Sequence, residues 1–221
     1  MCLRLDWATY ESAKYAVEHW HYSKRMPKSK IVRIGIWEDE KFIGVVIFGV
    51  GASAVAHLQY KVNPYQICEL VRVALSSHKA PVTNIISKSI SFLKKKCPNL
   101  QLITSFADPF EGHVGIIYQA GNWIYAGKTA EVIEFYYKGG WKHVTGIYKS
   151  LKREKIKTLK TRRKPAKYKY LMPLDKQMRK QIEPLRQPYP KRMPLGDSQR
   201  PVEDGGAIPT HTLQTQVAVN G

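Results

Sequence analysis

The sequence predicts a mixed α+β domain, in which helices flank a central and mostly antiparallel sheet, followed by a basic C-terminal extension. Strand-like apolar runs come in succession early in the chain and then alternate with helix-like segments. This order favours a mixed sheet with helices packed on it. The chain has 221 residues, 43% of them hydrophobic, which suits one domain with its own core plus an extra segment.

The N-terminal segment predicts one strand followed by one helix. Residues 2–7 form a short strand pattern. In the segment that follows, Tyr10, Ala13, Val17 and Trp20 recur at helical spacing. We therefore expect an amphipathic helix that ends near a histidine and a tyrosine.

A hairpin and a further strand are expected next. The segments 31–38 and 41–51 are apolar and are separated by a short acidic turn, which is typical of a hairpin. The second segment is apolar on both sides until its glycines, as a central strand would be. After an irregular stretch, residues 68–75 predict another strand.

The next part of the chain predicts helices alternating with strands. Residues 82–96 predict a helix, with Thr83 or Asn84 as the N-cap and with lysines in the last turn, where the helix dipole favours cations. The elements expected after it are a strand at 100–107, a short helix at 112–121, a strand at 122–128 and a closing hairpin over 131–150.

The charge of the chain indicates a polyanionic partner. There are 36 Lys and Arg against 17 Asp and Glu, a formal net charge of +19. Such an excess favours nucleic acid, with an anionic membrane surface as the alternative. Between Lys149 and Arg192 there are 17 Lys and Arg and three acids, so the charge is concentrated. No apolar stretch reaches the length of a membrane span.

These patterns divide the chain into three parts. We expect the sheet domain at 1–150, a basic and aromatic-containing extension that contacts nucleic acid at 151–193, and a disordered tail at 194–221, which is polar and rich in Gly and Pro. The three cysteines lack paired spacing and the N-terminus lacks the apolar segment of a secretory signal. Both features predict a cytoplasmic protein with reduced thiols.

Four segments carry a resemblance to known proteins. They are HYSKRMP at 21–27, ELVRVAL at 69–75, NIISKSI at 84–90 and ADPFEGHVGIIYQAGNW at 107–123. In this order they resemble the Mom family of phage DNA-modification proteins. The element order and the phrase GIIYQAGNWIYAG also resemble the GNAT acyltransferase fold. The resemblance covers roughly residues 1–150.

The resemblance implies a transferase that converts adenine in double-stranded DNA to N6-carbamoylmethyladenine and so shields phage DNA from restriction in the host cytoplasm. It implies an acyl-CoA-like donor, such as acetyl-CoA, wedged between two splaying strands. It also implies an iron ion held by His21, Tyr22, Asp108 and Tyr118. The oligomeric state stays open, a dimer being one possibility.

One loop departs from ordinary GNAT enzymes. They carry a glycine-rich loop that holds the CoA pyrophosphate, whereas the corresponding loop here is SSHKAPVTN, without glycine. An anion could still sit on the N–H groups that open the helix at 82–96, with help from Lys79, Asn84 and Ser87. The missing glycines put the use of plain acetyl-CoA in doubt.

Asp108 and Tyr118 are the first candidate catalytic residues. Asp108 follows an apolar strand, where ligand sites collect in such sheets, but an aspartate before Pro109 could equally cap a turn. Tyr118 could protonate a leaving group as a general acid, or it could be a core tyrosine on an apolar helix face.

His21, Tyr22 and Arg72 complete the catalytic set. His21 could be a base or a metal ligand. Alternatively, it could lie at the helix C-terminus only because the helix dipole favours a positive charge there. Tyr22 could stack on a base flipped from the duplex. Arg72 lies in an apolar strand, where a charge needs a partner, and Asp108 is the partner we expect from a neighbouring strand.

The remaining candidates would contact the donor or the DNA. His113 and Gly115 open a short helix that suits cofactor contact. A run of charge is usually solvated, but the density here favours phosphate contact, with Tyr168 and Tyr170 interleaved. The expected DNA-binding residues are Lys24, Arg25, Lys28, Lys30, Arg153, Arg162, Arg163 and Lys164.

Two other functions compete with DNA modification. One is a GNAT-type N-acetyltransferase that acts on a protein or a small amine, which a glycine-bearing loop would favour. The other is a non-catalytic nucleic-acid-binding protein, and the lack of a helix-turn-helix or RNP motif weighs against it. A non-catalytic protein would leave the side chains of His21, Asp108 and Tyr118 far apart.

Overall fold

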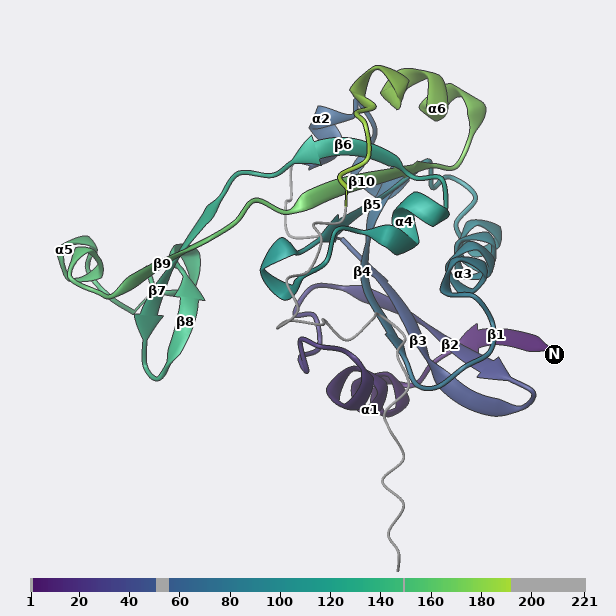
Figure 1. The fold of residues 1–221 in the computed structure, drawn as a ribbon, viewed down its shortest axis with the longest axis horizontal. Coiled ribbons are helices and arrows are strands. Elements are labelled where there is room, and N and C mark those ends of the chain that lie inside the picture. The colour runs from purple at the N-terminus through teal and green to yellow at the C-terminus, as the bar shows by residue number, and fades with distance from the viewer. Residues whose placement is uncertain (1, 51–55, 149, 192–221) are drawn as a thin grey trace, which may run out of the picture.

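The structure is a computed structural model that describes residues 2–50, 56–148 and 150–191. A seven-stranded sheet forms its centre (Figure 1). In spatial order its strands are β1 (Leu3–Trp7), β2 (Ile31–Glu38), β3 (Lys41–Gly49), β4 (Ile67–Leu75), β5 (Leu102–Ala107), β10 (Tyr168–Pro173) and β6 (Ile124–Lys128). Among these described strands, only β4 and β5 pair in parallel. The mixed, mostly antiparallel sheet is therefore confirmed.

Helices cover both faces of the sheet. The long helix α3 (Val82–Lys96) and the short helix α4 (Ile116–Ala120) pack on one face. The opposite face is covered by α1 (Tyr10–Trp20) over β3 and β4, and by α6 (Lys176–Ile182) over β5, β10 and β6. The short helix α2 (Ala56–Gln59) precedes β4. Among the described residues, no helix is long and apolar enough to cross a membrane.

The helix expected at 82–96 is confirmed, but its N-cap is not the predicted one. Pro81 holds the cap position and no side chain caps the helix. Thr83 and Asn84 lie inside the first turn, and the amide of Asn84 donates to the carbonyl of Pro81. Proline suits the start of a helix, where the missing N–H costs nothing.

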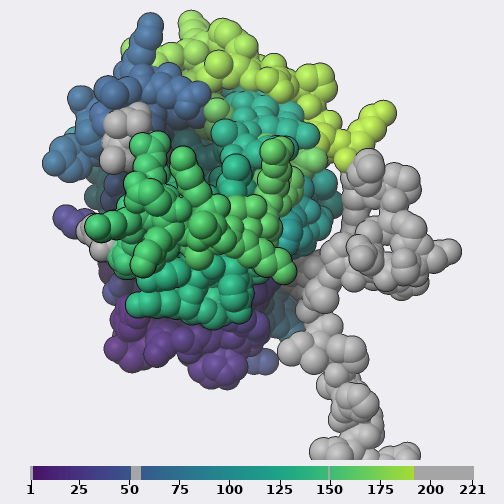
Figure 2. Space-filling model, turned by 90° about the vertical axis from the view of Figure 1, so that its left-hand side faces the viewer, coloured from purple at the N-terminus to yellow at the C-terminus, as the bar shows by residue number. Residues whose placement is uncertain are grey.

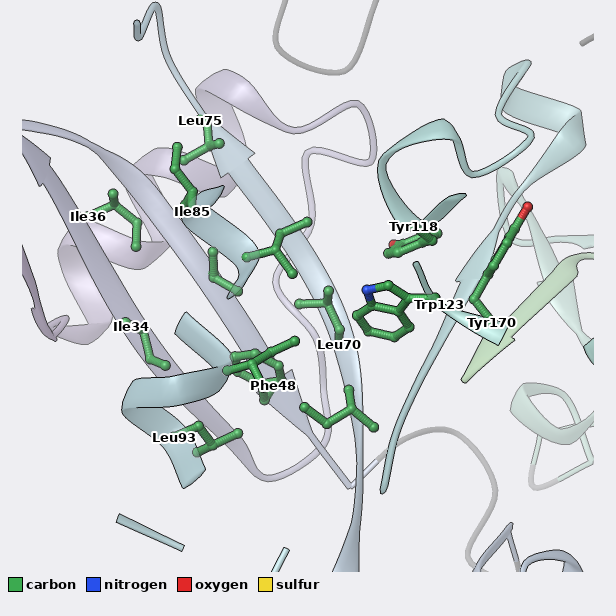
Figure 3. Packing of buried hydrophobic residues seen from close by; sticks show 14 of the residues in the cluster. Ile34, Ile36, Phe48, Leu70, Leu75, Ile85, Leu93, Tyr118, Trp123 and Tyr170 are labelled. Atoms are coloured by element: carbon green, nitrogen blue, oxygen red, sulfur yellow. The ribbon is translucent and has the colours of Figure 1, made fainter. Parts of the chain in front are cut away.

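The largest core cluster lies between the sheet and α3. Figure 3 shows Phe48 and Leu70 of the sheet facing Leu93 of α3, with Trp123 packed beside Leu70. Trp123 is 1% exposed and Tyr170 is fully buried. Burying a side chain of this size contributes on the order of 2–3 kcal/mol, so this cluster fixes the strands that carry the candidate site.

A second, three-stranded sheet projects from the first, between β6 and β10 (Figure 1). We call residues 129–167 the arm. Its elements are β7 (Val132–Tyr137), β8 (Gly140–His143), β9 (Thr161–Lys164) and the helix α5 (Arg153–Lys157). The predicted hairpin is confirmed as β7–β8, but the segment expected to complete it forms a 3-10 turn at Val144–Gly146.

The central sheet continues past residue 150, where the sequence predicted that the sheet domain ends. The chain returns from the arm as β10, which lies between β5 and β6. Tyr170, expected among phosphate contacts, is instead a core residue, and its ring lies against Tyr118 and Tyr125. The tail predicted at 194–221 lies outside the described residues.

Candidate active site

The site begins where β4 and β5 stop pairing. Their parallel ladder covers only Ile67–Glu69 and Leu102–Thr104. Beyond it, β4 remains paired with β3 up to Leu75, with a register shift at Val71. We call this place the β4–β5 junction. Backbone groups that lose their partner in the neighbouring strand need other hydrogen bonds. At the junction, side chains can supply these bonds.

Ser105 bridges the two strands at the junction. Its hydroxyl donates to the carbonyl of Leu70 at 2.9 Å and shares a hydrogen bond of 2.8 Å with the hydroxyl of Tyr118. Because a serine has one proton to give, Tyr118 is the donor in the second bond. Tyr118 is 8% exposed and comes from α4, so its hydroxyl reaches the junction from the α3 side of the sheet.

His21 and Arg72 lie on the α1 side. Arg72 of β4 is paired with Ile47 of the neighbouring strand β3, so their side chains share one face of the sheet. Ile47 packs against α1 on that face. His21 is the C-cap residue of α1 and is 8% exposed. The pKa of His21 is lowered to about 3, first by burial and then by the positive charges of Arg72, His113 and Lys24. The imidazole is therefore neutral at physiological pH, and these groups share one neighbourhood.

The tautomer of His21 follows from its hydrogen bonds. The backbone N–H of Ser23 donates to Nδ1 of His21 at 3.1 Å, and the hydroxyl of Ser23 lies 2.8 Å from the same atom. A backbone N–H can only donate, so Nδ1 accepts and the proton of the neutral ring sits on Nε2. In this arrangement His21 offers an N–H donor on Nε2 instead of a base.

Asp108 follows β5 and caps the tight turn at Pro109–Glu111. Its Oδ1 accepts from the amide of Phe110 at 3.0 Å, so the turn-capping interpretation is confirmed. Its backbone carbonyl accepts from the amide of His113 at 3.1 Å. The His113 ring lies 5.0 Å from that of Tyr22, which in turn lies 4.3 Å from that of His21. The Asp108 turn and the end of α1 therefore meet.

The expected ion pair between Arg72 and Asp108 is wrong. Oδ2 of Asp108 lies 3.0 Å from Nζ of Lys167 and 3.8 Å from Nζ of Lys164, so the arm supplies its partners. Arg72 donates from Nη1 to the carbonyl of Val71 at 2.7 Å, and its buried Nε has no hydrogen-bond partner among the described residues. The reason is the fold of the arm, which brings Lys164 and Lys167 to Asp108, whereas Arg72 on β4 does not reach it.

Other predicted DNA contacts also have partners within the protein. Arg162 forms an ion pair with Glu134 at 2.6 Å, and Lys164 pairs with Asp108. Arg153 and Arg163 are exposed, as are Lys24, Arg25, Lys28 and Lys30, and these six stay candidates for phosphate contact. The sequence did not single out Ser105, Glu134 or Lys167. Lys167 lies in a basic run, in which nothing distinguishes one lysine from the next.

The Mom protein family model matches residues 2–191 of the chain. The chain belongs to the Mom protein family. One curated Mom relative is the methylcarbamoylase mom of Escherichia phage Mu, which is 25% identical over 209 residues. The match covers 86% of this chain and 84% of the relative. The match to the Mom model extends beyond residue 150, in agreement with the place of β10 in the sheet.

Solved acetyltransferases are similar to this Mom chain in fold. An aminoglycoside acetyltransferase in complex with coenzyme A and kanamycin has a TM-score of 0.49 at 9% identity, over 82% of this chain and 99% of its own. A spermidine/spermine N-acetyltransferase from Vibrio cholerae, in complex with manganese ions, has a TM-score of 0.43 at 10% identity, over 82% and 96%.

The loop before α3 does not fit the pyrophosphate of coenzyme A. The amides of Lys79 and Ala80 each donate at 2.8 Å to the carboxylate of Glu38, which is 7% exposed. The next residue, Pro81, has no N–H. Two backbone donors of the loop that an anion could use are thus taken by an internal carboxylate. The side chains of Lys79, Asn84 and Ser87 are exposed, and their role in donor binding stays a prediction.

Gly115 has a structural role in this Mom chain. Its φ is +81°, and a Cβ added there would lie 2.4 Å from the ring of Tyr170. Only glycine accommodates both the left-handed backbone and this close approach. Packing therefore accounts for Gly115, and the predicted cofactor contact of His113 remains a prediction.

The residues proposed to hold iron do not fit a metal site as they are arranged. In His21, Nε2 carries the proton and Nδ1 accepts from the amide of Ser23. The Asp108 carboxylate already faces two ammonium groups, and the Tyr118 hydroxyl bonds to Ser105. A ligand nitrogen must be unprotonated. In the part of the chain that the structure describes, no three His, Cys, Asp or Glu side chains form a metal-binding group.

Proposed function

We propose that this chain is a DNA-modifying transferase that converts adenine in double-stranded DNA to N6-carbamoylmethyladenine, and that it protects phage DNA from restriction in the host cytoplasm. Membership of the Mom family and the name of the phage Mu relative support the proposal. The observation that carries it is that the Asp108 turn meets the end of α1: the amide of His113 donates to the Asp108 carbonyl, and the His113 ring lies against Tyr22, which lies against His21.

The chemistry explains what these residues must do. The product has a CH2 bonded to adenine N6, so the donor is a small molecule that carries a leaving group on the CH2 of a carbamoylmethyl unit. The new N–C bond forms as the leaving group departs with its electron pair, and N6 releases a proton to solvent. The Tyr118 hydroxyl would protonate the departing atom, giving up the hydrogen bond in which it donates to Ser105. The Nε2–H of His21 is placed to hold an oxygen or nitrogen of the donor.

The substrate must present an unpaired base, because adenine N6 is hydrogen-bonded inside the duplex. Tyr22 is 47% exposed and lies between the rings of His21 and His113. An exposed ring at the edge of the site suits stacking on a flipped base. The exposed basic loop after it, with Lys24, Arg25 and Lys28, would hold the neighbouring phosphates.

The test is mass spectrometry of nucleosides from plasmid DNA of bacteria that express the chain. We expect a modified deoxyadenosine with the wild type and none with Asp108→Asn, which keeps the shape of the side chain but removes its charge. Asp6→Asn is the matched control, because Asp6 is exposed on the edge strand β1. Unmodified plasmid with the wild type, or full modification by Asp108→Asn, would contradict the proposal.

A further inference from the structure

The arm is the part of the fold that the proposed chemistry does not use. It is inserted between two neighbouring strands of the central sheet and extends away from it (Figure 1). Residues 129–167 contain twelve Lys and Arg against three Glu. Figure 2, turned to view this side, shows the green arm in front of the sheet domain, on the surface that faces the viewer. So high a density of positive charge favours a polyanionic partner.

The two faces of the arm differ. Successive side chains of a strand point to opposite faces, and β7 pairs Glu134 with Arg162 of β9 and Tyr136 with Trp141 of β8. These four residues therefore share one face. Arg162 also lies over the ring of Phe110, in the turn that follows Asp108. This inner face is the one directed toward the candidate site.

Rings and cations form a continuous series on the inner face. Tyr136 packs edge-on against Trp141 at 5.4 Å, and Arg162 lies 4.6 Å from the centre of the Trp141 ring and 5.3 Å from that of Phe110. Lys164 lies 4.6 Å from the Phe110 ring and 3.8 Å from the carboxylate of Asp108. We call Tyr136, Trp141, Phe110, Arg162 and Lys164 the aromatic ladder.

The rings of the aromatic ladder are held in position but remain exposed. Tyr136 is 46% exposed and Phe110 is 47% exposed, although both rings are held in place by neighbouring side chains. Exposed rings interleaved with basic side chains are the arrangement with which proteins hold unpaired nucleotides, because every base has a face that stacks. The ladder also ends at Asp108, where the target adenine would have to arrive.

We propose that the aromatic ladder binds the DNA strand next to the flipped adenine, with bases stacked on Tyr136 and Phe110 and with phosphates on the exposed Lys and Arg of the arm. The link to adenine depends on the proposed function, whereas the binding of DNA by the ladder does not. The positive charge of the arm favours a nucleic acid as the molecule that binds the ladder. Because the proposed substrate is DNA with a flipped base, we take this nucleic acid to be a DNA strand separated from its complement.

Point variants test the ladder against the opposite face of the same strand. In Tyr136→Ala and Phe110→Ala we expect the affinity for a single-stranded DNA oligonucleotide to fall about tenfold, because base–aromatic stacking contributes at about this level. Ile133→Ala is the matched control, because Ile133 is 47% exposed and lies on the other face of β7. The oligonucleotide carries a fluorophore, and anisotropy gives the affinity.

An equal affinity in Tyr136→Ala, Phe110→Ala and Ile133→Ala would overturn the proposal. So would a loss of binding confined to an RNA oligonucleotide of the same sequence, which would assign the ladder to RNA. If the wild type modifies no DNA but the ladder variants still lose DNA affinity, the proposed function fails and the ladder stands. If modification and affinity both survive in the ladder variants, the ladder fails and the function stands.

Excision of the whole arm is the second test. Lys128 of β6 lies opposite Tyr168 of β10 in an antiparallel pair, so an Asn-Gly turn that replaces 129–167 would close the strands as a hairpin. Circular dichroism shows whether the sheet survives. We expect the excised protein to lose most of its affinity for the oligonucleotide, and wild-type affinity would overturn the proposal. Should the excised protein not fold, the point variants decide.

Discussion

At the scale of single residues, His21 couples stability to pH. Its pKa is about 3 in the folded protein and 6.5 when exposed, so the unfolded chain binds more protons between these values. The stabilisation is therefore complete above pH 6.5 and is lost as the pH falls toward 3. The difference is on the order of a few kcal/mol. We expect the free energy of unfolding to fall in this range, with a smaller fall in His21→Gln.

Urea unfolding at a series of pH values measures this effect. The control is His19→Gln, because His19 precedes His21 by two residues but is exposed at the end of α1. A pH dependence that is identical in wild type and His21→Gln would show that the buried imidazole takes no part.

Glu38 gives a second prediction at this scale. Glu38→Ala removes the acceptor of two amides, Lys79 and Ala80, and hydrogen bonds to charged groups are each worth about 1.5–3 kcal/mol. We expect a lower melting temperature that inorganic pyrophosphate partly restores, because the anion then reaches the vacated amides. Wild type should gain nothing from pyrophosphate. A wild-type gain equal to that of Glu38→Ala would show that the loop already accepts such an anion.

The candidate residues could be predicted from the sequence more readily than their partners. His21, Tyr22 and Asp108 follow helix or strand ends, and such ends are visible in the pattern of apolar residues. The partner of Asp108 depends on how the arm folds back over some 60 residues of chain. Charge alone did not distinguish Lys167 from Arg72 as that partner, because the choice is made by tertiary packing.

At the scale of elements, the bridge across the β4–β5 junction should behave as one unit. Ser105→Ala leaves the carbonyl of Leu70 and the hydroxyl of Tyr118 without this bond, and an unsatisfied buried polar group costs about 1–3 kcal/mol. Tyr118→Phe removes the other half of the same contact. We expect the double variant to be less destabilised than the sum of the two single variants.

Chemical denaturation of the four proteins gives the coupling between the two side chains. Thr104→Val is a useful comparison, because Thr104 is also buried in β5 but its hydroxyl donates to the carbonyl of Cys68. Strict additivity of Ser105→Ala and Tyr118→Phe would show that the bridge is not formed in solution.

Elements with a clear period could be predicted from the sequence, whereas their assembly could not. The helix at 82–96 and the hairpin of β2 and β3 follow from the spacing of apolar residues. The segment that becomes β10 is dense in lysine and tyrosine, and this composition favoured an exposed extension. Its apolar side chains are buried only when the strand pairs with β5 and β6. Those strands come from distant parts of the chain, so the local sequence does not reveal this burial.

At the scale of the whole molecule, the net charge of +19 predicts DNA binding that weakens steeply with salt. Each phosphate contact contributes about 0.9 to the slope of log affinity against log salt. The triple variant of Lys24, Arg25 and Lys28 to Ala should therefore lower the slope by up to about 3.

The same charge removed elsewhere is the control for that measurement. Lys88, Lys95 and Lys96 are exposed on α3, which covers the opposite face of the sheet from α1. Their triple Ala variant should leave the slope close to that of the wild type. Equal changes in the two triple variants would indicate that net charge alone, and not the loop after α1, holds the duplex.

The central claim is that the two faces of the sheet serve one reaction at the β4–β5 junction. The most direct measurement is the amount of modified deoxyadenosine in plasmid DNA from cells that express His21→Gln or Tyr118→Phe, alongside the DNA affinity of each purified variant. We expect both variants to lose the modified nucleoside while they bind DNA as the wild type does. Wild-type levels of modification in either variant would contradict the claim.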